Sequence, residues 1–367
     1  DTGAANPLQF PGCSSDHNIR GLNVSELSIC IMRLSAIGDV THVVPVVRAI
    51  RGRYPQARIT WIIGKLEAKL LAGLGDIEFI VFNKKGGFKA VQQLRQTLKG
   101  RTFDVLLHMQ VAARANLLSR LVKAPRRIGW DKPRWRDRHQ WFINQSVASV
   151  AQQHQVDAFL EFAHALGVPT GAPVWNLPVA EQDAEWARQT LGTDPSPILM
   201  ISPCSSHPLC NWSAERYAAI ADHAISGHGM RVVLTGGPSE LEVNTGQAIE
   251  AAMHYHAQNL IGKDTITQSV ALLQCATVLI SPDSGPAHIA SAVGTPVLGL
   301  YAATPSLRSG PYNSLDLCVD KYTEAARKFR QKEPEALRWG QRIEYPGVMD
   351  LIGVDEVLAQ LDGFMQS

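Results

Sequence analysis

The chain has 367 residues, 45% of them hydrophobic, and a formal net charge of +2 at pH 7. A chain of this size can bury large cores, and its length predicts about two domains. The small net charge gives no argument for a nucleic-acid partner, and we expect none.

Signals for membranes, metals and disulfides are few. No apolar run approaches the roughly 20 residues that span a bilayer, and the N-terminus has no basic-then-apolar signal pattern. Six cysteines are scattered without a C-x-x-C pair or histidines at zinc spacing, which favours reduced thiols and predicts no metal site. We therefore expect a cytoplasmic protein. Residues 1–26 are rich in Gly, Asn, Ser and Pro, and are expected to be a flexible extension or an expression leader.

From residue 27 onward, short β-rich runs alternate with amphipathic helical stretches, which is typical of parallel sheets covered by helices on both faces. In the first half the pattern predicts strands at residues 27–34, 59–63, 79–82 and 105–109, and helices near residues 40–53, 87–99 and 112–122. These elements predict one doubly wound α/β domain, residues 27–178. A Pro- and Gly-rich segment at residues 167–197, with one helix near residues 181–191, predicts a hinge.

The second half repeats the alternation and predicts a second doubly wound domain, residues 179–350. Its expected strands are residues 198–202, 231–234, 278–280 and 297–301, and its expected helices lie near residues 213–226, 239–252 and 266–273, with a closing helix at 354–361. Ligands of open α/β sheets bind outside the carboxyl ends of the strands. The loops after Leu34, Ser202, Leu234 and Ile280 are therefore expected to line a cleft between the two domains.

The loop after the first strand contains Asp39 at the mouth of the next helix, one residue after Gly38, which allows a sharp turn. A carboxylate at a cleft mouth can accept the proton of an attacking hydroxyl. An Asp at or near a helix N-cap also satisfies helix N–H groups without any substrate. Both interpretations stay open for Asp39.

Two loops of the second half carry polar residues that suit a nucleotide. Ser205 and Ser206 can donate hydrogen bonds to phosphate oxygens, although Ser-rich surface turns are also common. Glu240 follows a Gly-Gly turn and can accept hydrogen bonds from two ribose hydroxyls, or it can simply stabilise a helix start. Neither the dinucleotide motif G-x-G-x-x-G nor the P-loop motif occurs in these loops.

The segment at residues 277–301 reads TVLISPDSGPAHIASAVGTPVLGLY. An apolar strand ends in the polar turn Asp283-Ser284-Gly285, Pro286 stands at the expected helix start, and a second apolar strand follows. The free N–H groups at such a helix start, with their partial positive charge, form a site for phosphate. The segment is therefore predicted to hold an anion.

Between Arg114 and Arg138 there are nine basic residues against two acidic ones, with Trp130 and Trp135 interleaved and Trp141 just beyond. Such a stretch favours an acceptor site for an anionic substrate or a surface that touches anionic lipid head groups. A solvated helix face and loop is the alternative. The acceptor-binding candidates are Arg114, Arg120, Arg127 and Arg134.

Four segments in this order, RLSAIGDVTH, SPCSS followed by NWSAERYAAI, LTGGPSE and SPDSGPAHIASAVGTPVLGLY, resemble glycosyltransferase family 9, the ADP-heptose:lipopolysaccharide heptosyltransferases. The resemblance covers residues 27 to about 362 and includes the closing VMDLIGVDEVLAQL. It implies a GT-B architecture, with the acceptor bound by the N-terminal Rossmann-like domain and the nucleotide sugar by the C-terminal one. It also implies that the C-terminal helix, residues 351–367, returns toward the N-terminal domain.

The resemblance further implies inverting, metal-independent and cofactor-free transfer of heptose from ADP-heptose to the lipopolysaccharide inner core, either Kdo or the first heptose. It implies peripheral attachment at the cytoplasmic face of the inner membrane. By matching position, Asp39 is the implied catalytic base. The implied donor-binding residues are Arg33, Ser205, Ser206, Glu240, Asp283, Ser284, Gly285 and His288.

One position departs from the family pattern. Cys210 stands two residues before Trp212, where many members carry a Lys that places a charge on the departing diphosphate. A thiol does not supply that charge, so Arg33, His207 or another cation substitutes, or the donor preference or activity has shifted. Two other interpretations stay open: a nucleotide-sugar 2-epimerase of similar fold, and a non-catalytic nucleotide-sugar-binding protein.

Overall fold

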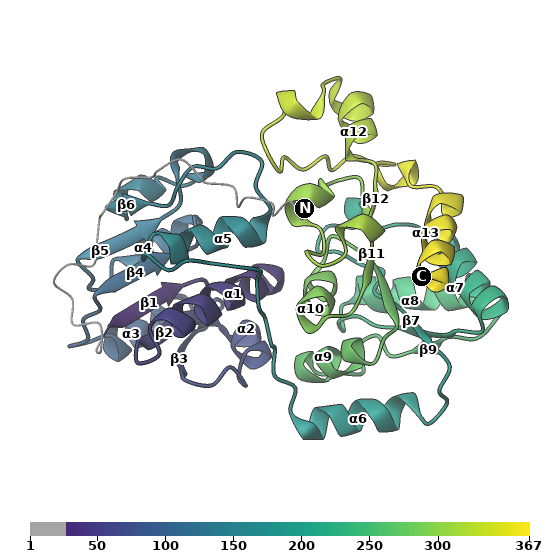
Figure 1. Cartoon of the computed structure of the whole chain (residues 1–367), viewed down its shortest axis with the longest axis horizontal. Helices are drawn as coiled ribbons and strands as arrows, with labels where there is room; N and C mark the ends of the chain where they lie inside the picture. The colour runs from purple at the N-terminus through teal and green to yellow at the C-terminus, as the bar shows by residue number, and fades with distance from the viewer. Residues whose placement is uncertain (1–26) are drawn as a thin grey trace, which may run out of the picture.

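The computed structural model describes residues 27–367, so the extension expected at residues 1–26 lies outside the described residues. Two six-stranded sheets, each entirely parallel, form the two halves of the chain. Figure 1 shows them side by side, with the purple-to-blue N-terminal half on the left and the green-to-yellow C-terminal half on the right. The expectation of two doubly wound α/β domains is confirmed.

The N-terminal sheet has the strand order β3-β2-β1-β4-β5-β6. Its strand β1 is central and buried along its whole length, with Ile31 paired between Trp61 and Leu107 of the flanking strands. Strands covered on both faces are apolar throughout, which is why this run was readable from the sequence. The elements are β1 (Ser28–Met32), α1 (Ile37–Arg53), β2 (Arg58–Gly64), α2 (Lys65–Leu70), β3 (Ile77–Phe82), α3 (Gly87–Thr97), β4 (Val105–His108), α4 (Ala113–Ser119), β5 (Arg126–Gly129), β6 (Gln145–Ser146) and α5 (Gln155–His164).

The C-terminal sheet has the order β12-β11-β10-β7-β8-β9. Its main elements are α6 (Glu181–Leu191), β7 (Ile198–Ile201), α7 (Ala214–His228), β8 (Arg231–Leu234), α8 (Glu240–Ala252), β9 (Gln258–Asn259), α9 (Ile266–Gln274), β10 (Val278–Pro282), α10 (Gly285–Val293), β11 (Val297–Tyr301), α11 (Ser306–Ser309), β12 (Val319–Asp320) and α12 (Tyr322–Ala325). The sequence reasoning missed β5, β6, β9, β12, α2, α5, α11 and α12. Four of these are strands of two to four residues, too short to show a periodic pattern.

The closing helix α13 (Val354–Gln366) corrects one expectation. It does not return toward the N-terminal domain but packs on α7 beside β11 and β12. Figure 1 shows it on the side of the C-terminal domain that faces away from the N-terminal domain. Val357 and Leu361 of α13 are fully buried there. The carboxylate of Asp362 lies 2.7 Å from His223 and 2.6 Å from His228 of α7. The apolar stripe of α13 is thus covered within its own domain.

The two domains touch directly along two helix pairs, α1 with α10 and α2 with α9. The chain between β11 and α13 also reaches back to the N-terminal domain. There Tyr312 donates a hydrogen bond to Asp157 at 2.8 Å, and Trp339 Nε1 donates to the carbonyl of Gln153 at 3.0 Å. Among the described residues, no helix is both long and apolar enough to cross a membrane.

Candidate functional site

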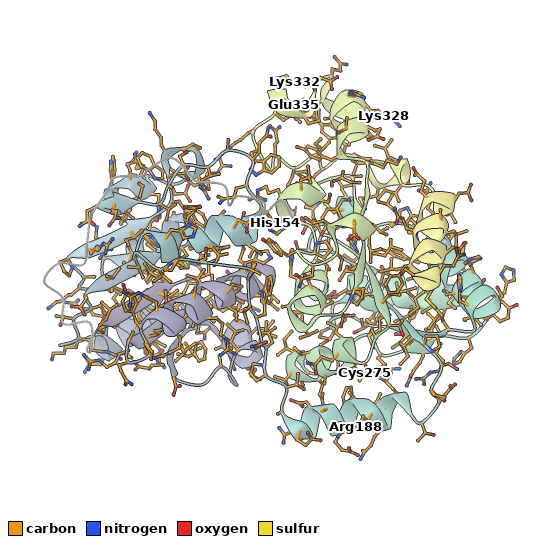
Figure 2. All side chains as sticks on the ribbon, viewed as in Figure 1. His154, Arg188, Cys275, Lys328, Lys332 and Glu335 are labelled. Carbon is orange, nitrogen blue, oxygen red and sulfur yellow. The ribbon has the colours of Figure 1, made fainter. Side chains whose placement is uncertain are left out.

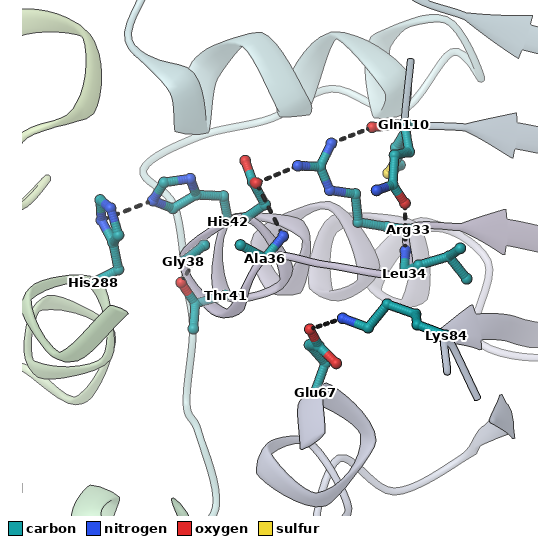
Figure 3. Close-up of polar contacts among 12 residues, drawn as sticks. Arg33, Leu34, Ala36, Gly38, Thr41, His42, Glu67, Lys84, Gln110 and His288 are labelled. Atoms are coloured by element: carbon teal, nitrogen blue, oxygen red, sulfur yellow. Dashed lines mark hydrogen bonds and ion pairs between the residues drawn. The ribbon is translucent and has the colours of Figure 1, made fainter. Parts of the chain in front are cut away.

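The turn from β1 into α1 presents a carboxylate at the domain boundary. Asp39 is the third residue of α1, and its carboxylate accepts the N–H of Ala36 at 3.2 Å and forms an ion pair with Arg33 (Figure 3). The Asp39 side chain is 31% exposed, so part of the carboxylate faces solvent. The two interpretations of Asp39 are therefore compatible, because it stabilises the helix start and still offers an open oxygen.

Arg33 has its partners within the N-terminal domain. Its Nη1 donates to the carbonyl of Met109 at 2.6 Å, and its guanidinium carbon lies 5.3 Å from the centre of the Phe159 ring. Together with the ion pair to Asp39, these contacts fix the side chain in place. Donor binding by Arg33 stays a prediction, whereas its role in orienting Asp39 follows directly from the geometry.

The start of α10, where an anion site is predicted, is a capped helix N-terminus. Ser284 caps the helix, accepting the N–H of Ala287 at 3.3 Å, and its hydroxyl lies 2.7 Å from that of Ser281. The helix begins at Gly285, one residue before Pro286. A Cβ on Gly285 would lie 3.4 Å from Cγ2 of Ile37, the first residue of α1. The N-termini of α1 and α10 therefore meet across the domain boundary.

Behind this contact, a chain of polar groups crosses from one domain to the other. His42 Nε2 lies 3.2 Å from His288 Nδ1 (Figure 3). On its other side, His288 Nε2 lies 3.3 Å from the Asp283 carboxylate. Ser309 donates to the other oxygen of Asp283 at 3.1 Å. Sequence reasoning missed His42, since a single His on a helix carries no signal until its partner is known.

Burial affects the charges of the polar groups at this domain boundary. It lowers the pKa of His42 well below the ordinary value, so the imidazole is neutral at pH 7. Burial acts to raise the pKa of Asp283, but the hydrogen bonds of its neighbours, that of His288 first, outweigh burial and leave the pKa below the usual range. Figure 2 shows His154 at the border of the domains, where burial lowers its pKa to about 4. The boundary thus holds two neutral histidines, His42 and His154, and an ionised Asp283.

Of the two serines in the turn after β7, only one is available to a ligand. Ser205 donates to the carbonyl of His207 at 3.0 Å and accepts its N–H at 3.3 Å, whereas Ser206 is exposed. Burial raises the pKa of the Cys210 thiol to about 11, which keeps it neutral at pH 7. Although the sequence predicted no metal site, His207, Cys210 and Glu344 each place one potential ligand atom within 4.8 Å of the others. Glu344 was invisible to spacing arguments because it comes from a distant loop.

Two acidic residues that follow β8 have different surroundings. Glu240, expected at the ribose, is exposed at the start of α8. Glu242 instead holds the turn: its carboxylate accepts the N–H of Gly237 at 2.7 Å and the hydroxyl of Ser239 at 2.6 Å. Glu240 is therefore free for a ligand, and its ribose contact stays a prediction.

One of the four acceptor candidates needs correction. Arg127 donates to the carbonyls of Phe142, Val122 and Ser119 at 2.8–2.9 Å, which ties β5 to the neighbouring loops. These donors are unavailable to an acceptor, so Arg127 is a structural residue. Sequence spacing does not distinguish such an Arg from a solvated one. Arg114 and Arg120 are more accessible, and Arg134 pairs with Asp131.

Comparisons with known proteins agree with this geometry. Residues 91–337 match the model of glycosyltransferase family 9 (heptosyltransferase). The lipopolysaccharide core heptosyltransferase OpsX of Haemophilus influenzae is 40% identical over 334 residues, which cover 91% of this chain and 96% of the relative.

Two solved structures show the same fold at 20% sequence identity. A family 9 glycosyltransferase of Veillonella parvula aligns with a TM-score of 0.76, covering 93% of this chain and 97% of that one. The ADP-heptose lipopolysaccharide heptosyltransferase II of E. coli aligns with a TM-score of 0.70, covering 93% and 99%. The two parallel sheets are thus those of a GT-B enzyme, and the chain belongs to glycosyltransferase family 9, the heptosyltransferase family.

Proposed function

We propose that this chain transfers L-glycero-D-manno-heptose from ADP-heptose to a hydroxyl of the lipopolysaccharide inner core, with inversion and without a metal ion. The acceptor is Kdo or the first heptose. The observation that carries the proposal is the meeting of the α1 and α10 N-termini, because it sets a carboxylate beside an anion site. The name of the OpsX relative supports the heptose and the lipopolysaccharide core.

The chemistry needs two groups on opposite faces of the sugar. As the bond from the anomeric carbon to the diphosphate breaks, its electron pair leaves with ADP, and the N–H groups at the start of α10 stabilise the growing negative charge. Asp39 accepts the proton of the acceptor hydroxyl while the hydroxyl oxygen bonds to the anomeric carbon. Attack opposite the leaving group inverts the anomeric centre.

The division of labour follows the domains. The N-terminal domain, residues 27–178, would bind the acceptor through Arg114, Arg120 and Arg134. The C-terminal domain, residues 179–350, would bind ADP-heptose through the exposed Ser206 and Glu240 and the start of α10. Family membership favours transfer over the 2-epimerase and non-catalytic alternatives, because both lack an acceptor reaction.

We also propose that the protein acts at the cytoplasmic face of the inner membrane. Three large apolar side chains of the N-terminal domain are strongly exposed: Phe88 (75%), Leu117 (66%) and Trp141 (59%). Beside one of them, Arg138 stacks over the Trp141 ring at 4.7 Å. Apolar anchors beside cations suit an anionic lipid surface. Co-sedimentation with anionic vesicles should fall in the Leu117→Ser/Trp141→Ser variant; unchanged sedimentation would remove this surface from the proposal.

The function is tested by a screen of ADP-heptose with defined truncated lipopolysaccharides, one ending in Kdo and one in the first heptose. Heptosylated product with an inverted anomeric centre, formed equally in EDTA, is expected from one of the two acceptors. Donor consumption without an acceptor would instead indicate isomerisation or hydrolysis. Loss of transfer in EDTA would contradict the metal-independent part.

A further inference from the structure

A departing diphosphate needs a compensating positive charge, and the cations expected from the sequence are already engaged. Arg33 is paired with Asp39, and His207 Nε2 lies 3.9 Å from Glu344. His288 faces Asp283 on one side and His42 on the other. A free cation must therefore come from elsewhere in the fold.

Arg308 occupies the required place. It lies on the short helix α11, directly before two residues that are fixed at the site: Ser309 donates to Asp283 at 3.1 Å, and the carbonyl of Gly310 lies 3.1 Å from Nε2 of His154 in the N-terminal domain. Because His154 is neutral and Gly310 offers a carbonyl, His154 donates this bond. Arg308 is thus positioned at the seam between Asp283 and the N-terminal domain.

The aliphatic part of the Arg308 side chain is packed against its neighbours, whereas its guanidinium is not bound by any described residue. A Cβ on Gly340 would lie 2.1 Å from Cδ and 2.2 Å from Nε of Arg308, so the Gly340 backbone rests against the stem. Gly340 has φ +71°, which suits glycine at this close approach. Within residues 27–367, the guanidinium of Arg308 makes no hydrogen bond or ion pair, and the side chain is half-buried.

The charges around Arg308 come from both domains. Burial lowers its pKa most, the charges of Asp39 and Asp283 act to raise it, and those of Arg342 and Arg134 act to lower it. Arg nevertheless stays protonated at neutral pH. The guanidinium therefore stands within the field of the proposed base Asp39 and of the α10 turn.

We propose that Arg308 binds the diphosphate of the nucleotide sugar and supplies the positive charge that Cys210 does not. The inference rests on the proposed function and names the residue that stabilises its leaving group. A guanidinium suits this task, because its planar donors can contact two phosphate oxygens at once. When the anomeric carbon–oxygen bond breaks, the electron pair moves onto the diphosphate beside Arg308, and the acceptor proton goes to Asp39.

Arg342 offers a matched control. It is a second Arg in the same region, but its side chain is more exposed and its Nη1 lies 3.3 Å from the Glu344 carboxylate. Arg342→Gln removes the same charge from a paired site, so it measures the general effect of net charge on nucleotide affinity.

The test compares ADP with adenosine, which lacks the diphosphate, by titration calorimetry. In Arg308→Gln, the Kd for ADP should rise roughly 10- to 100-fold, because a hydrogen-bonded charge is lost, whereas the Kd for adenosine should not change. Arg308→Lys should lie between Arg308→Gln and the wild type. With ADP-heptose, the kcat of Arg308→Gln should fall by about 100-fold. Thermal unfolding of each variant verifies that it is folded.

A rescue experiment locates the charge. Adding Cys210→Lys to Arg308→Gln should restore ADP affinity, since both cations would face the same phosphates. A double variant as weak as Arg308→Gln would overturn the inference that Arg308 takes over the role open at Cys210. Phosphate binding by Arg308 would be overturned if Arg308→Gln lost as much affinity for adenosine as for ADP. It would also be overturned if Arg308→Gln bound ADP no more weakly than Arg342→Gln. Wild-type protein that binds ADP through Arg308 but transfers no heptose would instead contradict the proposed function alone.

Discussion

His42 of α1 and His288 of α10 face one another across the domain boundary, with 3.2 Å between Nε2 of His42 and Nδ1 of His288. His288 Nε2 in turn lies 3.3 Å from the Asp283 carboxylate, so His288 connects His42 to the acid of the α10 turn. Among the described residues, the buried Nδ1 of His42 has no hydrogen-bond partner. The polar contact of His42 across the boundary therefore runs through its Nε2 alone.

This contact depends on the absence of a side chain at Gly38. A Cβ on Gly38 would lie 2.3 Å from Cδ2 of His288. Gly38→Ala should therefore displace His288 and destabilise the domain contact by about 1–3 kcal/mol, as overpacking does in cores. The urea concentration at the unfolding midpoint and the transferase activity should both fall.

Gly52→Ala is the control for that substitution, because Gly52 lies on the same helix and a Cβ there meets nothing within 4 Å. This variant should gain roughly 0.5–1 kcal/mol from helix propensity. A Gly38→Ala protein as stable and active as Gly52→Ala would show that α1 and α10 separate freely.

Replacing Asp39 tests the assignment of the base. Asp39→Asn retains the shape of the side chain but not its basicity, so kcat should fall by about 10²- to 10⁴-fold. The affinity for ADP should not change, because Asp39 belongs to the acceptor side. Asp39→Ala should also abolish transfer. Asp355→Asn, in the exposed first turn of α13, is the matched control. Full activity of Asp39→Asn would remove Asp39 from the mechanism.

Substitutions of the two acidic residues after β8 should affect different properties, ADP affinity for one and stability for the other. Glu240→Gln should raise the Kd for ADP by roughly tenfold, since a charged hydrogen bond to ribose is lost, and should leave the melting temperature unchanged. The same variant should bind 2′,3′-dideoxy-ADP like the wild type. Glu242→Gln should lower the melting temperature, because Gly237 and Ser239 lose a charged acceptor. Wild-type ADP affinity in Glu240→Gln would place the ribose elsewhere.

Acidification should destabilise the folded protein. Burial lowers the pKa of His154 and His139 to about 4 and that of His42 and His108 well below 6.5. The unfolded chain binds these protons first as the pH falls below 6.5, so stability is complete above that value and is lost toward pH 4. Each such histidine costs roughly 1.4 kcal/mol between pH 7.5 and 5.5.

The matching experiment is urea unfolding at pH 7.5 and 5.5, for the wild type, His154→Gln and His256→Gln. His154→Gln can still donate to Gly310 but cannot become charged, so its stability should depend less on pH. The exposed His256 provides the comparison and should behave like the wild type. Equal pH dependence in all three proteins would mean that His154 titrates normally.

Local patterns were enough to predict most of the two sheets. Strands such as β1 and β10 are covered on both faces, so their apolar runs are continuous and end at recognisable turns. The helix start of α10 was predicted as well, because Ser284, Gly285 and Pro286 form a start that depends only on neighbouring residues, whereas anion binding there stays a prediction. The structural role of Arg127 was not predicted, since its guanidinium donates to carbonyls of the nearby loops, and no side-chain pattern marks a backbone carbonyl as a partner.

The sequence by itself determined two doubly wound domains, the polar turn Asp283-Ser284-Gly285 at a helix start and a carboxylate at Asp39. Only the tertiary structure decided that α13 stays with its own domain, that His42 meets His288 and that, within residues 27–367, Arg308 has no ion-pair partner. Helix starts and strands follow from interactions within a few residues along the chain. The partners His42 and His288 are 246 residues apart, and their meeting depends on how two complete domains pack against each other.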